Sequence, residues 1–238
     1  AGIPVLLLDI PQAGAQKNAL AEAAIQRMKK AEPAPFMSAQ AMKLVTAGNI
    51  ETDLDQLKEC DWVVEAVIEK IEIKRELYAK LEQIVKPHAI ISSNTSTIPL
   101  QQLMEGRTSQ FRHQFFITHF FNPPRYTRLL EIVASKESNP DLLYRLYNFA
   151  DVALGKGVVL CKDSPGFIAN RIGTYWIQKA MVEAVERDIS VEEADAIFSK
   201  PFGIPKTGVF ALVDLVGVDL IPLITKSMQH LLPGSDRF

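Results

Sequence analysis

The chain has 238 residues, of which 47% are hydrophobic and 23% charged, and its formal net charge is −2. This composition is typical of a soluble globular protein, and the lack of a basic excess argues against a nucleic-acid-binding protein. No apolar run approaches the roughly 20 residues that a membrane-spanning helix needs. Cys60 and Cys161 are far apart beside apparent strands, which favours free buried thiols over a disulfide. We therefore expect a cytoplasmic protein that binds neither membrane nor nucleic acid.

Short apolar runs alternate with amphipathic stretches from residue 1 to residue 162. The apolar runs predict strands buried on both faces, and the amphipathic stretches predict helices. The predicted strands span 3–8, 62–67, 89–94, 115–121, 129–134 and 158–160; the predicted helices span 12–32, 38–46, 71–86, 99–104 and 139–154, with a helical turn at 53–60. The alternation indicates an α/β fold with a Rossmann-type, mostly parallel sheet covered on both faces.

The pattern changes at Asp163-Ser164-Pro165-Gly166. Asp163 or Ser164 is suited to cap a helix, and Pro165 suits a first helical turn. The stretches that follow read as helical over 167–187, 191–199, 210–216 and 219–232. We therefore predict an α/β domain over 1–162 and a small all-α domain over 163–238, which leans on the first domain or on a partner subunit.

One histidine and one carboxylate interrupt the two apolar runs that flank Asn122-Pro123-Pro124. If these runs pair as a hairpin centred on Arg125, His119 and Glu131 lie directly across from each other. Cross-strand Cβ atoms are about 5 Å apart, which lets a carboxylate bind an imidazole. The pair is therefore a candidate general base with an orienting partner. The alternative is a buried histidine satisfied by a backbone carbonyl.

Polar groups also follow the predicted strands, at the ends where parallel sheets bind ligands. Asp9 closes the first strand, where an acid can bind both ribose hydroxyls of adenosine, and no Arg follows it, which favours NAD over NADP. Glu69 with Lys74, the segment 94–97 and Asn170 are the other polar groups. Each has a structural alternative: Asp9 and 94–97 as helix caps, Glu69 and Lys74 as a solvated helix start, and Asn170 as a residue facing water.

A dinucleotide-binding fold also needs a first strand and a Gly-rich turn whose amides contact the pyrophosphate. The sequence contains no G-x-G-x-x-G, and residue 1 falls just after the place where that strand, turn and helix would lie. Without them the sheet would have a gap in its middle, with exposed strand edges. We therefore interpret the α/β domain as N-terminally incomplete.

Several motifs together resemble the L-3-hydroxyacyl-CoA dehydrogenase family, over almost the whole chain. They are Ser93-Asn94-Thr95-Ser96, His119-Phe120-Phe121-Asn122-Pro123-Pro124, Glu131, Asp163-Ser164-Pro165-Gly166-Phe167-Ile168-Ala169-Asn170-Arg171, Phe202-Gly203-Ile204-Pro205 and Asp214-Leu215-Val216-Gly217. The Asn-Pro-Pro-Arg-Tyr loop and the turn at 205–208 are most similar to the bacterial branch whose longer chain also carries an enoyl-CoA hydratase. The family's helical domain continues past Phe238, so the resemblance implies that the second domain is truncated.

The resemblance implies that the chain oxidises (S)-3-hydroxyacyl-CoA to 3-oxoacyl-CoA with NAD in fatty acid β-oxidation. His119 would take the proton of the C3 hydroxyl, and Glu131 would hold its tautomer and stabilise the imidazolium. Ser96 and Asn170 would position the substrate's oxygens, and Asn122 would support the loop. The cofactor-binding positions would be Asp9, Ala66, Glu69, Lys74 and Asn94, and no metal is implied. The implied partners are an acyl-CoA substrate and either a second copy, as a homodimer, or a hydratase domain in the same chain.

Two other functions stay open. The first is another β-hydroxyacid dehydrogenase on the same fold, but those enzymes commonly use a lysine base, and no lysine lies in the first turns of the helix that carries Asn170. The second is a non-catalytic module that binds CoA or a nucleotide, or that interacts with other proteins. The missing glycine turn favours this module, and the His119–Glu131 pair argues against it.

Overall fold

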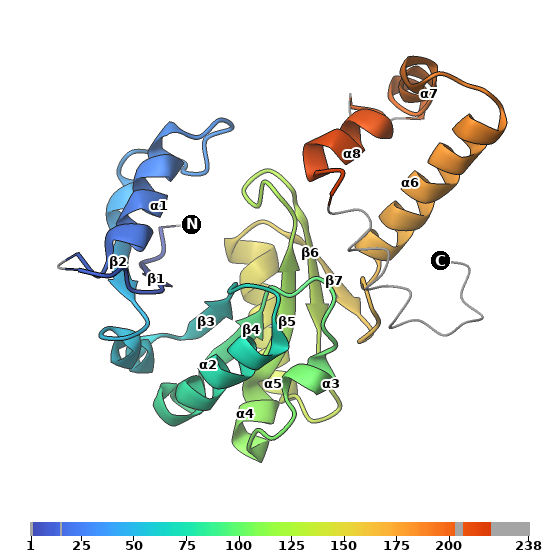
Figure 1. Ribbon diagram of the computed structural model, residues 1–238. Coiled ribbons are helices and arrows are strands. Elements are labelled where there is room, and N and C mark those ends of the chain that lie inside the picture. The colour runs from blue at the N-terminus through green and yellow to red at the C-terminus, as the bar shows by residue number, and fades with distance from the viewer. Residues whose placement is uncertain (1, 15, 203–206, 220–238) are drawn as a thin grey trace. The chain divides into compact units, whose positions relative to one another are not determined.

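The computed structural model describes residues 2–14, 16–202 and 207–219 (Figure 1). The chain divides into two compact units, Ala1–Asp163 and Ser164–Phe238, which are described separately below. The helix predicted over 219–232 lies outside the described residues, apart from its first residue.

Five strands form the main sheet of the first unit, in the order β3-β4-β5-β6-β7. They are β3 Trp62–Glu65, β4 Ile90–Ser93, β5 Phe115–Phe120, β6 Leu129–Val133 and β7 Gly157–Cys161. Strands β3, β4 and β5 run parallel, as do β6 and β7, whereas β5 and β6 are antiparallel. The predicted, mostly parallel sheet is therefore confirmed, and its antiparallel pair is the hairpin expected around Arg125.

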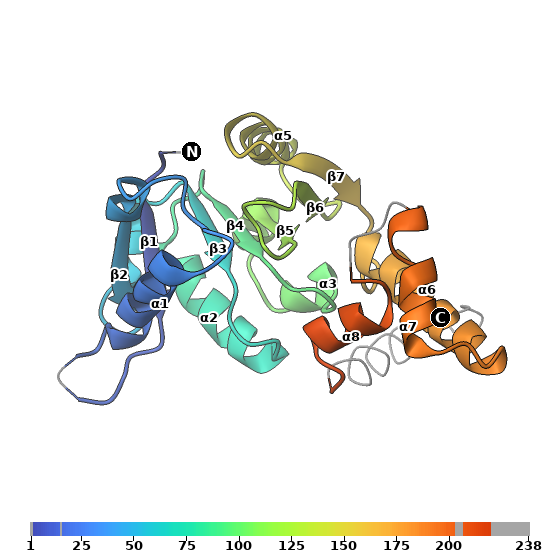
Figure 2. The ribbon, with the colours of Figure 1, turned by 90° about the horizontal axis from the view of Figure 1, so that it is seen from above.

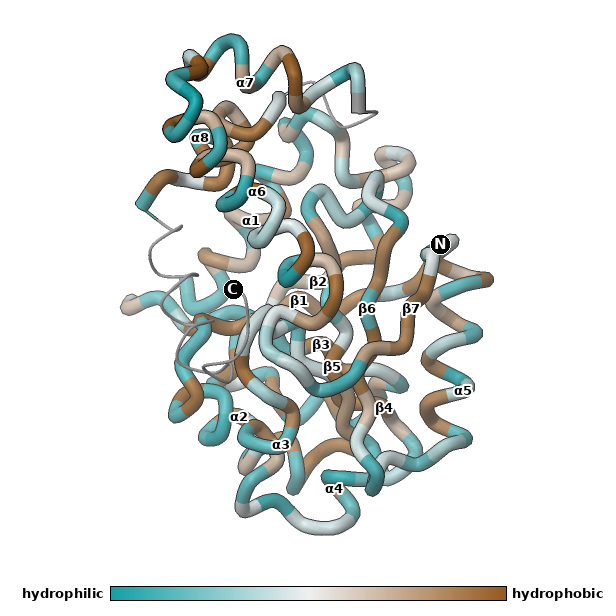
Figure 3. The backbone as a smooth tube through the Cα atoms, turned by 90° about the vertical axis from the view of Figure 1, so that its right-hand side faces the viewer, coloured by the Kyte–Doolittle hydropathy of each residue, from teal (hydrophilic) through white to brown (hydrophobic). Residues whose placement is uncertain are grey.

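Helices cover both faces of this sheet (Figure 2). Successive strand residues point to opposite faces, so Phe115 and Phe116 of β5 enter two different cores. On one face Tyr78 of α2 (Ile71–Ile84) meets the ring of Phe115 edge-on, with centroids 5.0 Å apart. On the other face Leu142 and Leu146 of α5 (Pro140–Asn148) pack with Phe116 in one buried cluster. Figure 3 shows the alternating hydrophobic and hydrophilic residues of α5 that give it one core-facing side.

A second, two-stranded parallel sheet consists of β1 (Val5–Asp9) and β2 (Val45–Asn49). Among the described strands, β1 pairs only with β2, and β3 pairs only with β4, so the expected gap in the sheet is present. The prediction that the first strand is buried on both faces is wrong, since none of its five residues is buried and Val5 is 47% exposed. A sheet of only two strands offers too few side chains to build a packed core on both faces.

Two helices predicted in this part of the chain differ from the observed structure. The helix predicted over 12–32 is the shorter α1 (Ala19–Lys30), because Gly14 has a φ of +105°, which a right-handed helix cannot contain. The helix predicted over 38–46 is only a 3₁₀ turn, Ala41–Leu44. The β-branched Val45 and Thr46 instead begin β2, where pairing with β1 outweighs the helical pattern.

Short helices and turns complete the first unit. They are a 3₁₀ helix at Leu54–Glu59, α3 Leu100–Leu103, α4 Ser109–Gln114 and a π-helical turn at Phe149–Ala153 that extends α5. The Asn-Pro start of α5 is as expected, since the Asn139 side chain accepts hydrogen bonds from the amides of Asp141 and Leu142. Helix α4 was not predicted.

Asp163 caps a different helix from the one expected. Its Oδ1 accepts a hydrogen bond from the amide of Leu100 (2.8 Å), and its Oδ2 accepts one from Gln101 (3.2 Å). The first amides of a helix have no partner within that helix, so a carboxylate from elsewhere in the chain satisfies those of α3. The prediction that Asp163 or Ser164 caps the helix after Pro165 is wrong, because α6 begins at Ala169 and none of the described side chains caps it.

The described part of the second unit contains only helices, as predicted. They are α6 Ala169–Glu186, α7 Val191–Ile197, a 3₁₀ turn at Lys200–Phe202 and α8 Phe210–Val216. Ser190 and Glu193 form a capping box at the start of α7. Asp195 of α7 accepts hydrogen bonds from the amides of Phe210 and Ala211, which joins α7 to the first turn of α8.

We expect Phe116→Ala to lower the free energy of unfolding by about 3–5 kcal/mol, because Phe116 is fully buried and its removal leaves a cavity between β5 and α5. The measurement is urea unfolding of the full chain. Val152→Ala is the control, since Val152 is 77% exposed and should change stability by less than about 0.5 kcal/mol. Equal losses in the two variants would contradict this packing.

Candidate active site

His119 and Glu131 lie opposite each other in the antiparallel register of β5 and β6. The His119 Nδ1 atom is 2.8 Å from Glu131 Oε2, and the two side chains are only 6% and 1% exposed. The ring of Phe121 meets the imidazole edge-on, with centroids 4.5 Å apart. The strand pairing expected from the sequence is therefore confirmed, together with direct contact between the two side chains.

This contact determines which nitrogen of the imidazole is basic. A carboxylate accepts hydrogen bonds, so Nδ1 carries the hydrogen that lies between the two groups, and the basic lone pair is on Nε2. A negative charge 2.8 Å from the ring also stabilises an imidazolium after Nε2 has taken a proton. The partner of Nδ1 is the Glu131 carboxylate, so the alternative of a backbone carbonyl is wrong for this nitrogen.

Asn94 joins the carboxyl ends of three strands at this site. Its amide donates to the carbonyl of Glu65 at the end of β3 (2.8 Å), and its side-chain Oδ1 accepts from the amide of Phe120 (3.0 Å). Phe120 directly follows His119 on β5, and Asn94 directly follows β4. Asn94 therefore holds the end of the strand that carries the candidate base.

A buried polar network lies beneath the carboxyl ends of β3 and β4. The Glu65 carboxylate accepts hydrogen bonds from Lys74 Nζ (2.8 Å), the Tyr78 hydroxyl, the Ser93 hydroxyl (2.6 Å) and the amide of Val67 (2.7 Å). The side chains of Lys74 and Glu65 are 1% and 0% exposed. Burial, and then the charge of Glu65, raise the pKa of Tyr78, so its hydroxyl remains a donor. The expectation of a solvated Lys74 is thus wrong.

Glu69 connects this network to the turn that carries Ser96. Its carboxylate lies 3.2 Å from Lys74 Nζ and accepts hydrogen bonds from the amide of Ser96 (3.1 Å) and from the hydroxyls of Thr95 and Thr97. Burial alone would raise the pKa of Glu69, but the Thr95 hydroxyl and the Lys74 charge outweigh it and lower the pKa. Glu69 is therefore an anion that orders the turn after β4.

The remaining predicted site residues lie in four places. Asp9 is exposed at the carboxyl end of β1, where its Oδ1 accepts from the amide of Ile10 (2.7 Å); it caps no helix, since α1 begins only at Ala19. Ala66 is exposed directly after β3, and Asn122 is exposed after β5. Asn170 is half-buried in the first turn of α6 and belongs to the second unit.

Glu65, Tyr78 and Cys161 were not predicted as parts of this site. A signal was present for the first two, because Glu65 interrupts an apolar strand and Lys74 and Tyr78 are four residues apart on one helix face. Cys161 of β7 lies diagonally across from Glu131, which is paired with Val159. Burial, followed by the charge of Glu131 and a hydrogen bond to it, raises the pKa of Cys161 to about 11. No sequence signal places this thiol beside the carboxylate.

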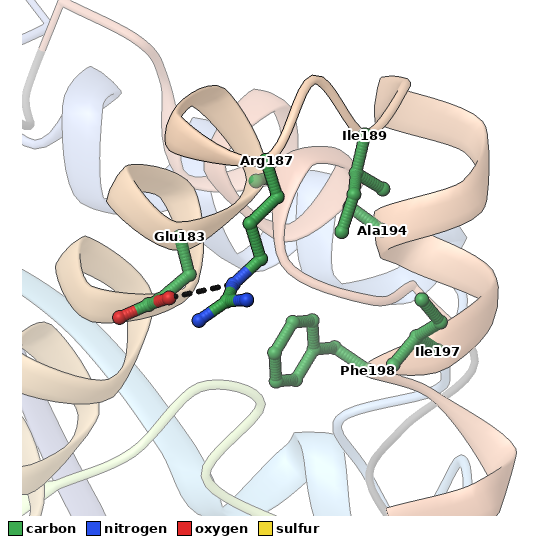
Figure 4. Close-up of a pocket in the computed structure, with 7 residues that line it drawn as sticks. Glu183, Arg187, Ile189, Ala194, Ile197 and Phe198 are labelled. Carbon is green, nitrogen blue, oxygen red and sulfur yellow. Dashed lines mark hydrogen bonds and ion pairs between the residues drawn. The ribbon is translucent and has the colours of Figure 1, made fainter.

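A separate hollow of about 270 Å³ lies in the second unit, between α6 and α7 (Figure 4). Its walls include Ile189, Ala194 and Phe198, and the ion pair of Arg187 with Glu183 (2.9 Å) lies beside it. It contains none of the predicted site residues. Within the described ranges, no three His, Cys, Asp or Glu side chains are grouped to hold a metal, and no helix is long and apolar enough to span a membrane.

Comparisons with known proteins identify the same family for both units. The family described as "3-hydroxyacyl-CoA dehydrogenase, NAD binding domain" matches residues 1–164, and "3-hydroxyacyl-CoA dehydrogenase, C-terminal domain" matches residues 166–237. A Deinococcus radiodurans protein named as a 3-hydroxyacyl-CoA dehydrogenase is 42% identical over 239 residues, which are 100% of this chain and 69% of that protein.

Two further relatives differ in how much of their length this chain matches. A Rickettsia felis protein named as a fatty acid oxidation complex trifunctional enzyme is 39% identical over 98% of this chain, but the match spans only 33% of that protein. The crystal structure of (S)-3-hydroxybutyryl-CoA dehydrogenase from Ralstonia eutropha has a TM-score of 0.78 at 27% identity, over 97% of this chain and 80% of that one.

We expect Lys74→Met to lower the free energy of unfolding by about 3–5 kcal/mol, because it leaves the buried Glu65 carboxylate without its cation. Urea unfolding measures the loss. Lys80→Met, on the exposed side of the same helix, is the matched control and should cost less than about 0.5 kcal/mol. A loss in Lys74→Met no larger than in the control would show that the pair does not stabilise the fold.

We expect alkylation of Cys161 to be slow at pH 8, because a thiol with a pKa of about 11 is only about one part in a thousand thiolate there. Its rate should rise until the pH approaches 11. In Glu131→Gln the neighbouring charge is lost, so the pKa should fall and alkylation at pH 8 should be faster. Mass spectrometry of the Cys161 peptide after iodoacetamide treatment measures both rates, and Glu105→Gln, an exposed site, is the control. Equal rates in the Glu131 and Glu105 variants would contradict the contact.

Proposed function

The chain belongs to the 3-hydroxyacyl-CoA dehydrogenase family, and we propose that it oxidises the C3 hydroxyl of (S)-3-hydroxyacyl-CoA to a ketone. The family resemblance in the motifs is thereby confirmed, and NAD is the cofactor named for the family's first domain. The observation that supports the proposed chemistry most directly is the 2.8 Å contact between His119 and Glu131. A dehydrogenase of an alcohol needs a group that takes the hydroxyl proton, and this dyad is suited to that task.

In the proposed mechanism His119 Nε2 takes the proton of the C3 hydroxyl. Glu131 keeps the ring in the tautomer that presents Nε2, and its charge stabilises the imidazolium that forms. Asp9, Ala66, Glu69 and Asn94 would hold NAD, which would supply the acceptor for the hydride of C3. The burial of both side chains strengthens this electrostatic support, because little water competes for the pair.

We assign the positioning of substrate oxygens to Ser96 and Asn170, and support of the loop after β5 to Asn122. Ser96 suits this role because Glu69 accepts a hydrogen bond from its backbone amide, which holds the turn in place. Asn170 suits it by chemistry, since a side-chain amide both donates to and accepts from a hydroxyl or a carbonyl.

The residues at the strand ends fit a nicotinamide dinucleotide. Asp9 presents an exposed carboxylate at the carboxyl end of a parallel strand, which is where an acid binds ribose hydroxyls. Ala66, Glu69 and Asn94 follow the ends of β3 and β4 and would line the same site. Lys74 would contribute through Glu69, since its ammonium contacts Glu65 and Glu69.

We further propose a place in fatty acid β-oxidation, in the cytoplasm. The Rickettsia felis relative, named for a fatty acid oxidation complex, supports the pathway. That relative is named as trifunctional and this chain matches 33% of it, which supports an enoyl-CoA hydratase domain as the proposed partner of the dehydrogenase. The alternative partner is a second copy of the chain, as in a homodimer.

A second candidate function is a non-catalytic module that binds CoA or a nucleotide. The separation of β1 and β2 from the other five strands favours it. One experiment distinguishes the two functions. A full chain that binds CoA in a titration, and yet consumes no NADH with acetoacetyl-CoA, would be a binding module.

We expect His119→Ala to lower turnover of acetoacetyl-CoA by about 10²–10⁴-fold, with CoA binding retained, because a positioned general base contributes about that much. The assay follows NADH absorbance. His88→Ala is the control, because His88 is exposed and lies before β4. Normal turnover in His119→Ala would remove the catalytic assignment.

A further inference from the structure

Lys156 is a buried lysine that the proposed mechanism does not use. It is 6% exposed and lies between the π-helical turn Phe149–Ala153 and β7. Its ammonium donates hydrogen bonds to the carbonyl oxygens of Pro124 and Thr127 (2.8 Å for Thr127) and lies 5.5 Å from the centre of the Phe120 ring. The interactions found for this cation are thus with two carbonyl groups and an aromatic face.

Burial of an ammonium group costs free energy unless other groups replace its water. Burial lowers the pKa of Lys156. Two carbonyl dipoles and an aromatic ring offset part of the cost, and the hydrogen bonds hold the backbone that supplies them. If this position only had to fill space, an apolar residue would serve. We therefore take the role of the Lys156 ammonium to be the binding of these two backbone carbonyl groups.

That backbone is the 121–128 loop, defined here as the residues that join β5 to β6. His119 is two residues before the loop, and Glu131 is three residues after it. Lys156 bonds to the loop near its middle and near its end, at Pro124 and Thr127. The loop is therefore the connection that sets how the strands of the dyad meet, and Lys156 fixes two of its carbonyl groups.

The neighbours of Lys156 bind the same loop. The amide of Gly157 donates to the carbonyl of Arg128 (2.8 Å), and Arg128 Nε donates to the carbonyl of Gly155 (3.3 Å). Gly155 has a φ of +66°, so it allows the tight turn that brings Lys156 to the loop. The segment 155–157 is thus a second support for the hairpin, in addition to the pairing of β5 with β6.

The opposite side of the loop is attached to a different part of the first unit. Arg125 Nη1 donates to the carbonyls of Ala34 (2.6 Å) and Phe36 (2.7 Å), and the Tyr126 hydroxyl donates to Ala34 (2.9 Å). Arg125 and Tyr126 are exposed, whereas Lys156 is buried. The attachment at Lys156 is consequently the one shielded from water, and we expect it to constrain the loop more.

We propose that Lys156 is a positioning residue for the dehydrogenase reaction, which holds the 121–128 loop so that His119 and Glu131 keep their productive geometry. This inference depends on the function proposed above. It assigns Lys156 no contact with substrate or cofactor. A displacement of a reacting group by about 1 Å can cost 10²-fold in rate, so a residue that acts only through the loop can have a large effect.

The test replaces Lys156 by Met, which keeps the length of the side chain and removes its donors. In the full chain we expect faster hydrogen exchange of the 121–128 amides and a kcat with acetoacetyl-CoA lowered by about 10- to 100-fold. The KM for NADH should change by less than about twofold, because the residues proposed to hold the cofactor are not altered. Lys156→Arg should restore most of the turnover, since it keeps donors and charge.

Lys80→Met is the matched control, and it should leave both loop exchange and kcat as in the wild type. Unchanged hydrogen exchange of the loop in Lys156→Met would overturn the proposal. Faster exchange with an unchanged kcat would also overturn it, because Lys156 would then be purely structural. If Lys156→Met does not fold, Lys156→Gln replaces it, with a smaller loss of the same kind expected. Absence of turnover in the wild-type chain would contradict both the proposed function and the positioning role. The hydrogen-exchange data would still show whether Lys156 holds the 121–128 loop.

Discussion

The antiparallel pairing of β5 with β6 is the constraint on which the candidate site depends. In a sheet that is otherwise built from parallel pairs, this hairpin brings residues 119 and 131 into one register position. Cross-strand pairing sets the separation of the two backbones, so the 2.8 Å contact between imidazole and carboxylate needs no long, flexible side chain to span a gap. A base held by strands on both sides keeps its orientation better than one on a free loop.

A second set of interactions holds the turns around that hairpin. Glu65 and Lys74 form a buried ion pair, and Lys74 extends it to Glu69, which orders the turn that carries Ser96. Such a network is expensive to bury and gains little over an apolar core in stability alone. Its value here is geometric, because its hydrogen bonds join α2 to β3 and β4 to β3, and through Glu69 they hold the turn that carries Ser96.

Asn94 and Lys156, two residues near the site, each form hydrogen bonds with two backbone groups. Asn94 bonds to both β3 and β5, and Lys156 bonds to two carbonyls of one loop. Removal of the Asn94 side chain would leave the amide of Phe120 without this hydrogen bond, and removal of the Lys156 side chain would do the same to the carbonyls of Pro124 and Thr127. A substitution at either position is therefore expected to change stability together with turnover.

Local pattern and strand register were enough to predict the alternation of strands and helices, the hairpin, the pairing of His119 with Glu131 and the gap between the first strand and the rest. It did not predict β2, because pairing with β1 outweighs the helical pattern that was expected to extend to residue 46. Nor did it place Asp163 on α3, Cys161 beside Glu131, or Lys74 on Glu65. The contacts of Asp163 and Cys161 join residues distant in the chain, and that of Lys74 joins a helix to a strand, so the packing of the elements against one another sets which polar groups are buried together.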